Sequence, residues 1–451
     1  METSVRSRVP ASRTGVTELT RPHSAPGPAG TTTAGPRAAG AGFWIVAYVF
    51  AVTMAFTTVP APLYVLYQAR DHFGAAMVTV IFAAYAAGVV TSLLLAGHVS
   101  DWLGRRRIVA AAVGINMAAG LVFLAWPTIT GLLAGRLVSG ISAGLITATA
   151  TAFLAELHSS SRPGAPSARA ELVSTAANLG GLGFGALLAG FLAEYTAAPL
   201  WLPYLVAEGL MLAGAIALAA APETVVRPDP RPRYRPQRVR VPAGQRPVFY
   251  AAGLAAAAAF ALFGLFTSLA PGFIAGTLHE SSHALAGLST FIVFGAAALA
   301  QISVGRLPLS RGRQARLGLG LLAAGVAAVT AAVWLPSLAL FLAGGAIAGA
   351  GAGATFKTSI TTALSIAPDG ARGETLAGLF VAAYLGLTVP VVGLGIATQL
   401  VTTRAAILGF AAVLIAVVAA VSRKQGAPQA SGSAGVKLPG VRNGSGASFR
   451  G

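Results

Sequence analysis

The stretch GHVSDWLGRRR, residues 97–107, lies between two long apolar runs and decides the fold. The flanking runs, 75–98 and 107–126, can each cross a bilayer as a helix, because about 20 residues span the hydrocarbon core. Arginines in a short loop beside such helices resist translocation across the membrane. We therefore expect a membrane protein whose 97–107 loop lies on the cytoplasmic side.

The composition of the whole chain also indicates a membrane protein. Hydrophobic residues make up 55% of the 451 residues and charged residues only 10%, whereas about 25% of the residues in a soluble domain are charged. A net charge of +18 would suit a nucleic-acid partner. The arginines, however, lie in short loops and tails beside apolar runs, so topology explains them better and we expect no nucleic-acid partner.

The sequence argues against metal, cofactor and enzyme classes. It contains no cysteine, which excludes disulfides and thiolate zinc sites. It also contains no phosphate-binding P-loop motif for direct ATP drive. We therefore expect no metal, no cofactor and no enzymatic activity.

Twelve apolar runs follow one another from Ala41 onward. Helix is the structure that fits them, because unpaired backbone groups are costly in lipid and no run alternates polar and apolar residues as a β-barrel strand does. The predicted fold class is an all-α polytopic membrane protein with twelve transmembrane helices in two pseudo-symmetric six-helix bundles. The runs are 42–66, 75–98, 107–126, 129–153, 171–194, 200–220, 248–274, 283–305, 315–334, 337–366, 373–399 and 404–421.

The connections between the runs differ in charge. The connections after the even-numbered runs hold seventeen Lys and Arg, whereas the connections after the odd-numbered runs hold two. We therefore expect both termini in the cytoplasm and the protein in the cell membrane. The predicted organisation is a disordered cytoplasmic tail over 1–41, bundles over 42–221 and 248–421, an extended Pro- and Arg-rich cytoplasmic linker over 222–247, and a second disordered cytoplasmic tail over 422–451.

The two halves are similar to each other at an offset near 209 residues. The clearest match joins the fourth and tenth runs, where Gly140 and Gly144 correspond to Gly349 and Gly353. Small residues let helix backbones approach closely, which matters where lipid supplies no hydrophobic drive for association. Chance in a glycine-rich chain is the alternative explanation. A true repeat predicts two equivalent bundles that rock about a central cavity.

Two signatures resemble those of the major facilitator superfamily of secondary transporters, and the resemblance covers roughly residues 42–421. Residues 97–107 fit the family's loop 2–3 signature, GxLaDrxGrkxxl. Arg136 begins a stretch similar to the family's RxxxG signature on the fourth helix. The resemblance implies the twelve-helix fold of that family in its bacterial form.

The fifth run carries a third pattern of the same family. It is similar to the GxxxGPxxGG pattern of exporters, with Gly181, Gly185 and Gly190 in place. Ala186 stands where the pattern has proline and Ala189 where it has glycine. Close helix packing is preserved by these small residues, but the proline kink is missing.

The resemblance implies a conformational latch in the 97–107 loop. In this family the carboxylate, here Asp101, faces the positive end of helix 11, and the arginine, here Arg105, reaches the end of helix 4 near Glu156. Carboxylates are favoured at helix N-termini. The alternative is that these charges only set the topology. The implied latch residues are Gly97, Asp101, Gly104, Arg105, Arg106 and Glu156.

Charged residues inside apolar runs are candidates for the substrate or proton pathway, because a charge at that depth is costly unless it faces a cavity or a partner. Arg136 either snorkels to the outer membrane surface or faces the cavity, where it binds an anionic group or tunes a nearby carboxylate. Glu208 lies at similar depth, so it either pairs with Arg136 or is a snorkelling or locally hydrated glutamate. Lys357 either snorkels or is a cavity cation that attracts an anionic substrate or is displaced by a cationic co-substrate. Tyr384 and Asn178 are candidates by family analogy.

The leading hypothesis is a secondary active transporter that alternates a central site between the two membrane faces. Proton-coupled efflux of a small, partly apolar, drug-like compound or metabolite by an antiporter is the first choice. A proton-coupled importer or a facilitator of a small metabolite is the alternative, favoured by the imperfect pattern of the fifth run. The expected partners are a small-molecule substrate, the proton and the lipid bilayer, and the protein is expected to be a monomer.

Overall fold

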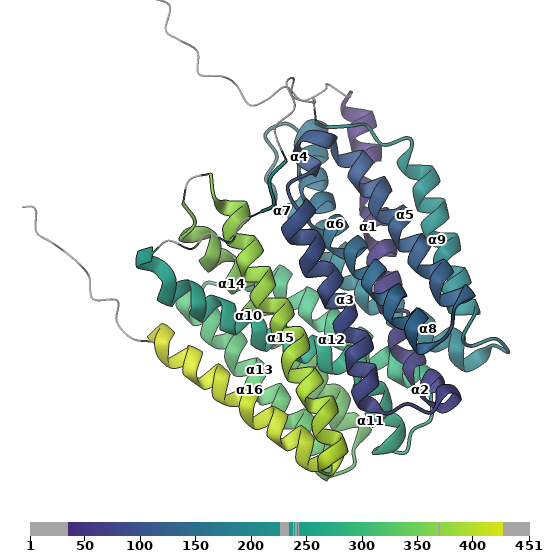
Figure 1. Cartoon of the computed structure of the whole chain (residues 1–451). Coiled ribbons are helices and arrows are strands. Elements are labelled where there is room, and N and C mark those ends of the chain that lie inside the picture. The colour runs from purple at the N-terminus through teal and green to yellow at the C-terminus, as the bar shows by residue number, and fades with distance from the viewer. Residues whose placement is uncertain are drawn as a thin grey trace, which may run out of the picture.

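Every regular element in the described part of the chain is a helix (Figure 1). This confirms the all-α polytopic fold predicted from the apolar runs. The expected tails over 1–34 and 427–451 and much of the expected linker lie outside the described residues. The computed structural model describes residues 35–225, 234–237, 239, 241, 243–368 and 370–426.

The first half of the chain forms a bundle in which two membrane passes are built from more than one element. The first pass consists of α1 and α2, and the fifth consists of α7, the π-helical turn η1 and α8. The elements are α1 (Pro36–Thr58), α2 (Pro60–Asp71), α3 (Ala75–Ala96), α4 (Ser100–Leu103), α5 (Arg105–Ala125), α6 (Ile129–Ser161), α7 (Ala168–Thr175), η1 (Ala176–Gly180), α8 (Gly181–Tyr195) and α9 (Leu202–Leu218).

The second half follows the same order, with α10 and α11 together corresponding to α1 and α2. It packs against the first half through α12 on α8 and α15 on α3, and the two pairs run side by side in Figure 1. The elements are η2 (Ala243–Gln245), α10 (Arg246–Ser268), α11 (Ala270–Gly276), α12 (His283–Val304), α13 (Arg311–Trp334), α14 (Leu338–Ser365), α15 (Arg372–Leu400) and α16 (Thr403–Gly426).

Eleven spans in the described residues are long and apolar enough to cross a membrane. The remaining predicted run, 200–220, forms α9, which has 17 residues. At 1.5 Å per residue this helix reaches about 26 Å, against a hydrocarbon core of about 30 Å. The twelfth crossing therefore stays a prediction.

The first and last helices extend beyond the boundaries predicted from the sequence. Helix α1 begins at Pro36, inside the predicted tail, because proline is preorganised for the first helical position and has no N–H to leave unpaired there. Helix α16 continues to Gly426, beyond the predicted end at 421, since Arg, Lys and Gln are good helix formers.

Proline breaks one long pass but not another. The first pass is interrupted at Val59, directly before Pro60, because proline cannot donate a backbone hydrogen bond and its ring crowds the preceding turn. Helix α15 instead continues through Pro390. The first pass is therefore divided at Val59 into α1 and the shorter α2.

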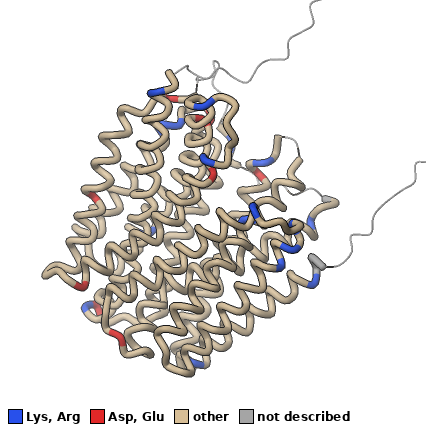
Figure 2. Tube along the Cα trace, turned by 180° about the vertical axis from the view of Figure 1, so that it is seen from behind, with Lys and Arg blue, Asp and Glu red and all other residues tan. Residues whose placement is uncertain are grey.

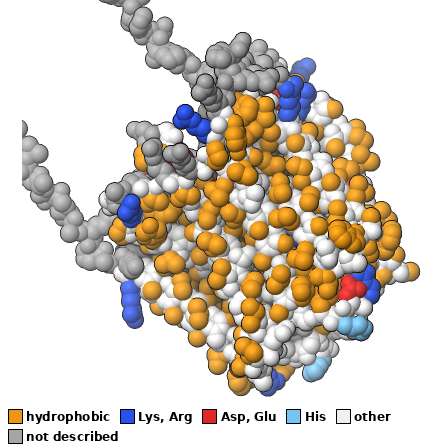
Figure 3. Space-filling view, in the orientation of Figure 1, with side chains coloured by type: hydrophobic (Ala, Val, Ile, Leu, Met, Phe, Trp, Pro, Cys, Tyr) orange, Lys and Arg blue, Asp and Glu red, His pale blue; other side chains and the backbone are white. Residues whose placement is uncertain are grey.

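Charged residues are concentrated at the ends of the molecule. Most described Lys and Arg lie toward the end that carries α4 (Figure 2), where α6 and α14 end and α15 begins. We call this the arginine-rich end. Hydrophobic side chains cover the face between the two ends (Figure 3). This distribution suits a surface embedded in a bilayer.

Close helix crossings depend on the seven glycines predicted to pack helices. An added Cβ at any of them would overlap the backbone of a neighbouring helix. Six of these crossings lie within one bundle, and Gly190 instead lies against α12 of the second bundle. The backbone neighbours are Tyr85 for Gly140, Val89 for Gly144, Ala51 for Gly181, Ala55 for Gly185, His283 for Gly190, Val293 for Gly349 and Ala297 for Gly353.

We expect Gly140→Leu to destabilise the protein, because its side chain would overlap the α3 backbone, and overpacking costs about 1–3 kcal/mol or more. Gly114→Leu is the matched control, since Gly114 on α5 has open space beside it. Thermal unfolding of the detergent-purified proteins, followed by tryptophan fluorescence, should show a lower Tm for Gly140→Leu only. Equal Tm values for the two variants would contradict a packing role.

Candidate functional site

A cavity of about 610 Å³ lies between the two bundles. Its lining residues come from α1, α3, α6 and the fifth pass of the first bundle, and from α10, α12, α14 and α15 of the second. Both halves of the repeat therefore contribute to one central site. The volume lies within the range of about 300–1,000 Å³ that small-molecule sites occupy.

The cavity extends to the arginine-rich end. Its lining includes Gly97 at the end of α3, Leu364 near the end of α14 and Gly373 at the start of α15. At the opposite end the bundles touch, since Gly190 lies against His283 and Gly395 against Thr79. The two bundles are thus apart at the arginine-rich end and in contact at the other.

Aromatic rings form the second bundle's side of the cavity. The ring centroid of Phe260 lies 4.8 Å from that of Phe356 and 5.3 Å from that of Tyr384, and the Phe263 and Phe294 rings stack at 4.8 Å. All five residues line the cavity. Such pairs add packing energy beyond their buried area, so this wall is a rigid apolar surface.

Two formally charged side chains are among the cavity's described lining residues, one from each bundle. The ammonium of Lys357 on α14 lies 3.5 Å from a carboxylate oxygen of Glu171 on α7. Lys357 therefore lines the cavity and reaches a partner on the other bundle, while its role toward a substrate stays a prediction. The sequence analysis did not select Glu171, because a glutamate at the start of the fifth run is common in the first turn of a helix.

Arg136 lies behind the cavity wall and is not among the lining residues. Its side chain is 1% exposed. The guanidinium donates hydrogen bonds to the Tyr64 hydroxyl at 2.7 Å and the Thr57 carbonyl at 2.5 Å, and it lies over the Phe82 and Tyr85 rings. The guanidinium is therefore held by hydrogen bonds and aromatic rings of its own bundle, although its buried Nη2 has no hydrogen-bond partner among the described residues. It supports Thr57 and Tyr85, which do line the cavity.

The ion pair between Glu208 and Arg136 is not formed, so that alternative is wrong. Glu208 on α9 packs against Gly120 on α5, and its buried Oε1 has no hydrogen-bond partner. Glu208 faces α5, whereas the Arg136 guanidinium binds the Tyr64 hydroxyl on α2 and the Thr57 carbonyl on α1. Equal depth in the membrane therefore did not bring these two side chains, on α9 and α6, together.

Tyr384 and Asn178 both line the cavity, where the sequence prediction placed them. Tyr384 on α15 interacts with Tyr85 on α3 through their side chains, so these hydroxyls meet across the two bundles. Asn178 lies in η1. Single π-helical turns inside longer helices occur frequently at functional sites, and this turn directs a polar side chain into the cavity.

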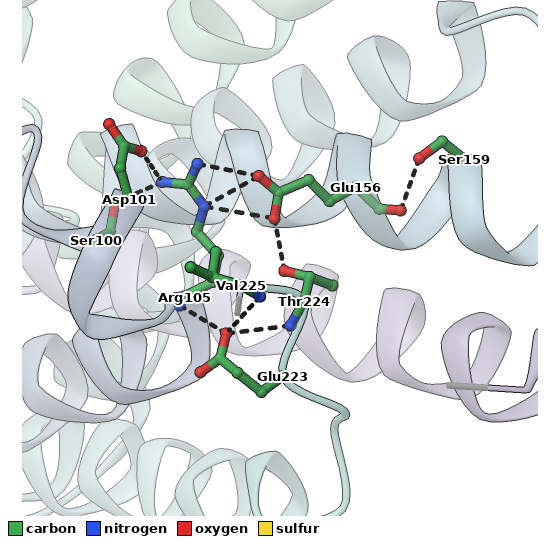
Figure 4. A network of polar contacts seen from close by, with 8 residues as sticks. All are labelled: Ser100, Asp101, Arg105, Glu156, Ser159, Glu223, Thr224 and Val225. Atoms are coloured by element: carbon green, nitrogen blue, oxygen red, sulfur yellow. Dashed lines mark hydrogen bonds and ion pairs between the residues drawn. The ribbon is translucent and has the colours of Figure 1, made fainter. Parts of the chain in front are cut away.

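Three of the implied latch residues, Asp101, Arg105 and Glu156, form a hydrogen-bonded network at the arginine-rich end (Figure 4). The Arg105 guanidinium binds Asp101 at 2.6 Å and Glu156, on α6, at 2.9 Å. Gly104 takes a φ of +107° directly before it, a conformation that side chains with a Cβ rarely adopt. Arg106 donates to the carbonyls of Ala219 and Ala221 after α9.

Two residues of this network come from the segment after α9 and were missed by sequence reasoning. Glu223 accepts a hydrogen bond from the Arg105 backbone N–H at 2.8 Å. The Thr224 hydroxyl donates to Glu156 at 2.5 Å (Figure 4). The sequence signal that could have identified Glu223 was its carboxylate directly after the sixth apolar run. The predicted linker therefore begins as part of this network.

The position of Asp101 differs from the expectation that it faces the positive end of helix 11, here α15. It pairs with Arg105 within its own loop, and its side chain is 60% exposed. Gln237 of the predicted linker instead lies against both Gly97 and Gly373, at the ends of α3 and α15. Its backbone N–H donates to the Leu94 carbonyl at 2.8 Å. The linker, expected to stay outside any packed region, thus contacts both bundles at the cavity mouth.

No group of three His, Cys, Asp or Glu side chains in the described ranges could hold a metal ion. What the geometry offers is a binding cavity with an aromatic wall and one ion pair.

The sequence matches the Major Facilitator Superfamily model over residues 43–389. No curated protein matches it at a significant level. The fold is similar to the human organic anion transporter MFSD10 (TETRAN), with a TM-score of 0.62 and 16% identity over 85% of this chain and 99% of that one. It is also similar to a bacterial homologue of the human lysosomal transporter Spinster, in an inward-facing and unoccupied conformation, with a TM-score of 0.63 and 15% identity over 87% and 98%.

A third similar structure is a POT family transporter in complex with 5-aminolevulinic acid, with a TM-score of 0.69 and 12% identity over 87% of this chain and 97% of that one. At such identities these structures show the fold alone. The family model, in contrast, covers well over half of the chain. This chain therefore belongs to the Major Facilitator Superfamily and is a multi-pass membrane transport protein.

Proposed function

We propose that this protein is a proton-coupled secondary transporter that exports a small, partly apolar compound by alternating access. The observation that carries the proposal is the cavity, because both bundles line it and it extends to one end of the molecule only. A rocking motion that separates the contacts at the opposite end would expose the same residues on the other side. The aromatic wall supports a partly apolar substrate.

The arginine-rich end is assigned to the cytoplasm, since cationic connections are retained on that side. With this orientation the described conformation is inward-facing, like that of the bacterial Spinster homologue. Both termini then lie in the cytoplasm, and the protein acts as a monomer in the cell membrane.

Import or facilitated diffusion is the second candidate function. It is supported by the departures of Ala186 and Ala189 from the exporter pattern. It is also supported by the cavity lining, in which Glu171 is the carboxylate available for proton transfer. The similar structures concern an organic anion transporter and a transporter bound to 5-aminolevulinic acid, which illustrates how widely substrates vary on this fold.

A substrate screen followed by vesicle transport tests direction and coupling. Compounds are first selected by accumulation in a bacterial strain without its own exporters, with and without this protein. We expect the selected compound to accumulate in inverted vesicles with an acidic interior and to leak out when a protonophore collapses the gradient. Accumulation only in right-side-out vesicles would contradict export, and accumulation without a gradient would contradict proton coupling.

We further propose that the network around Arg105 is a latch that holds the arginine-rich ends of the first bundle in one conformation. Arg105→Ala removes the partners of Asp101 and Glu156 and should slow transport about tenfold, because hydrogen bonds to charged groups contribute roughly 1.5–3 kcal/mol. Arg107→Ala is the matched control, since it removes the same charge from the same loop at an exposed position. The measurement is the initial transport rate per folded protein.

Equal rates for Arg105→Ala, Arg107→Ala and the unmodified protein would mean that these arginines only set the topology. Equal losses for both variants would show that the loop's charge matters but its hydrogen bonds do not. Either result contradicts the latch.

A further inference from the structure

We propose that the cavity binds an amphipathic organic anion, whose acidic group displaces the carboxylate of Glu171 from the ammonium of Lys357. This inference rests on the proposed function as a small-molecule transporter and names the chemical class of its substrate. It also assigns Glu171 a role as an internal anion that occupies the site when no substrate is bound.

The first support is the position of the ion pair. Lys357 and Glu171 are the formally charged members of the described cavity lining. They lie on different bundles, with 3.5 Å between the ammonium and a carboxylate oxygen. Any charged ligand in the cavity must therefore interact with one of these two groups or leave its own charge unpaired.

The second support is the unequal environment of the two partners. The side chain of Glu171 is 60% exposed and that of Lys357 is 36% exposed. The Ser167 hydroxyl also donates a hydrogen bond to Glu171 at 3.1 Å. If the pair opens, Glu171 keeps this donor and water. The less hydrated Lys357 has Glu171 as its one side-chain hydrogen-bond partner in the described part of the chain.

Displacement by an anion is therefore easier than displacement by a cation. An anion that binds Lys357 leaves behind the better solvated carboxylate. A cation that binds Glu171 leaves behind the less solvated ammonium, and an unpaired charge is more costly where less water reaches it. The pair itself is partly exposed and at 3.5 Å is long, so it opposes displacement only weakly.

The third support is the apolar surface beside the ammonium. Phe356 precedes Lys357 on α14, and its ring lies 4.8 Å from that of Phe260 and 5.8 Å from that of Phe380. A ligand with its acidic group on Lys357 can place an aromatic or aliphatic body against these rings. The site thus combines one cation with an adjoining hydrophobic wall, which fits an amphipathic anion.

The test uses three probes of one shape and different charge: 1-naphthylacetate, neutral 1-naphthylacetamide and protonated 1-(1-naphthyl)ethylamine. Each is titrated by calorimetry into the full chain in lipid nanodiscs at neutral pH, without any gradient. We expect the anion to bind most tightly and the cation most weakly. Because binding is measured at equilibrium, the result does not depend on whether the protein exports, imports or couples to protons.

Two substitutions test the exchange of carboxylates. Lys357→Gln should weaken binding of the anion about tenfold, as expected for loss of a charge-assisted hydrogen bond, and leave the neutral probe unchanged. Glu171→Gln should tighten binding of the anion about two- to fivefold, because the competing carboxylate is gone and an exposed pair is worth little. A merely structural ion pair would weaken all probes in both variants.

Glu374→Gln is the matched control, because Glu374 is the repeat counterpart of Glu171 at the start of the eleventh run and is not part of the cavity lining. It should bind all three probes as the unmodified chain does. Unchanged affinity of the neutral probe, together with the Tm of each variant, shows that the cavity is intact. Tighter binding of the cation, no binding of the anion, or weaker binding of the anion by Glu171→Gln would each overturn the proposal.

Discussion

The close approach of helix backbones is the constraint on which the rest of this structure depends. Inside a bilayer, helices gain little from hydrophobic contact with each other, because lipid chains are as apolar as their side chains. Glycines at the crossings of α6 with α3 and of α14 with α12 allow the contacts that replace this missing drive. The same geometry in both halves builds two bundles that can separate at one end and touch at the other.

The cavity follows from this packing, and its chemistry follows from which side chains the bundles leave unpacked. Within the first bundle, Arg136 donates hydrogen bonds to the Tyr64 hydroxyl and the Thr57 carbonyl. Lys357 and Glu171 meet only across the gap between the bundles. The buried Arg136 therefore supports the cavity wall from behind. Lys357 and Glu171, at the cavity surface, are the charged groups that a ligand can contact.

The sequence predicted the fold well because membrane helices leave a strong local signal. Long apolar runs, cationic loops and small residues at repeat positions are all properties of single segments, and they placed α3, α5 and α12 correctly to within a few residues. The latch pairing of Arg105 with Glu156 was also expected, through a family motif with fixed spacing.

Properties that depend on helix rotation were not predictable. Glu208 and Arg136 have similar depth, but their helices turn them toward different neighbours. Glu171 has an ordinary helix-start position, and only the distance between α7 and α14 makes it a cavity residue. Gln237 lies in a segment whose proline and arginine content indicated an extended linker, and its contacts with Gly97 and Gly373 arise from tertiary structure alone.

The central claim is that two rigid bundles rock about the cavity, and paired spin labels measure this motion most directly. The chain has no cysteine, so labels can be placed cleanly at Arg162→Cys and Ser365→Cys near the arginine-rich end, and at Ala197→Cys and Ser281→Cys at the opposite end. When turnover conditions shift the conformation, the first distance should shorten while the second lengthens. Two distances that stay fixed, or that change in the same direction, would contradict the account.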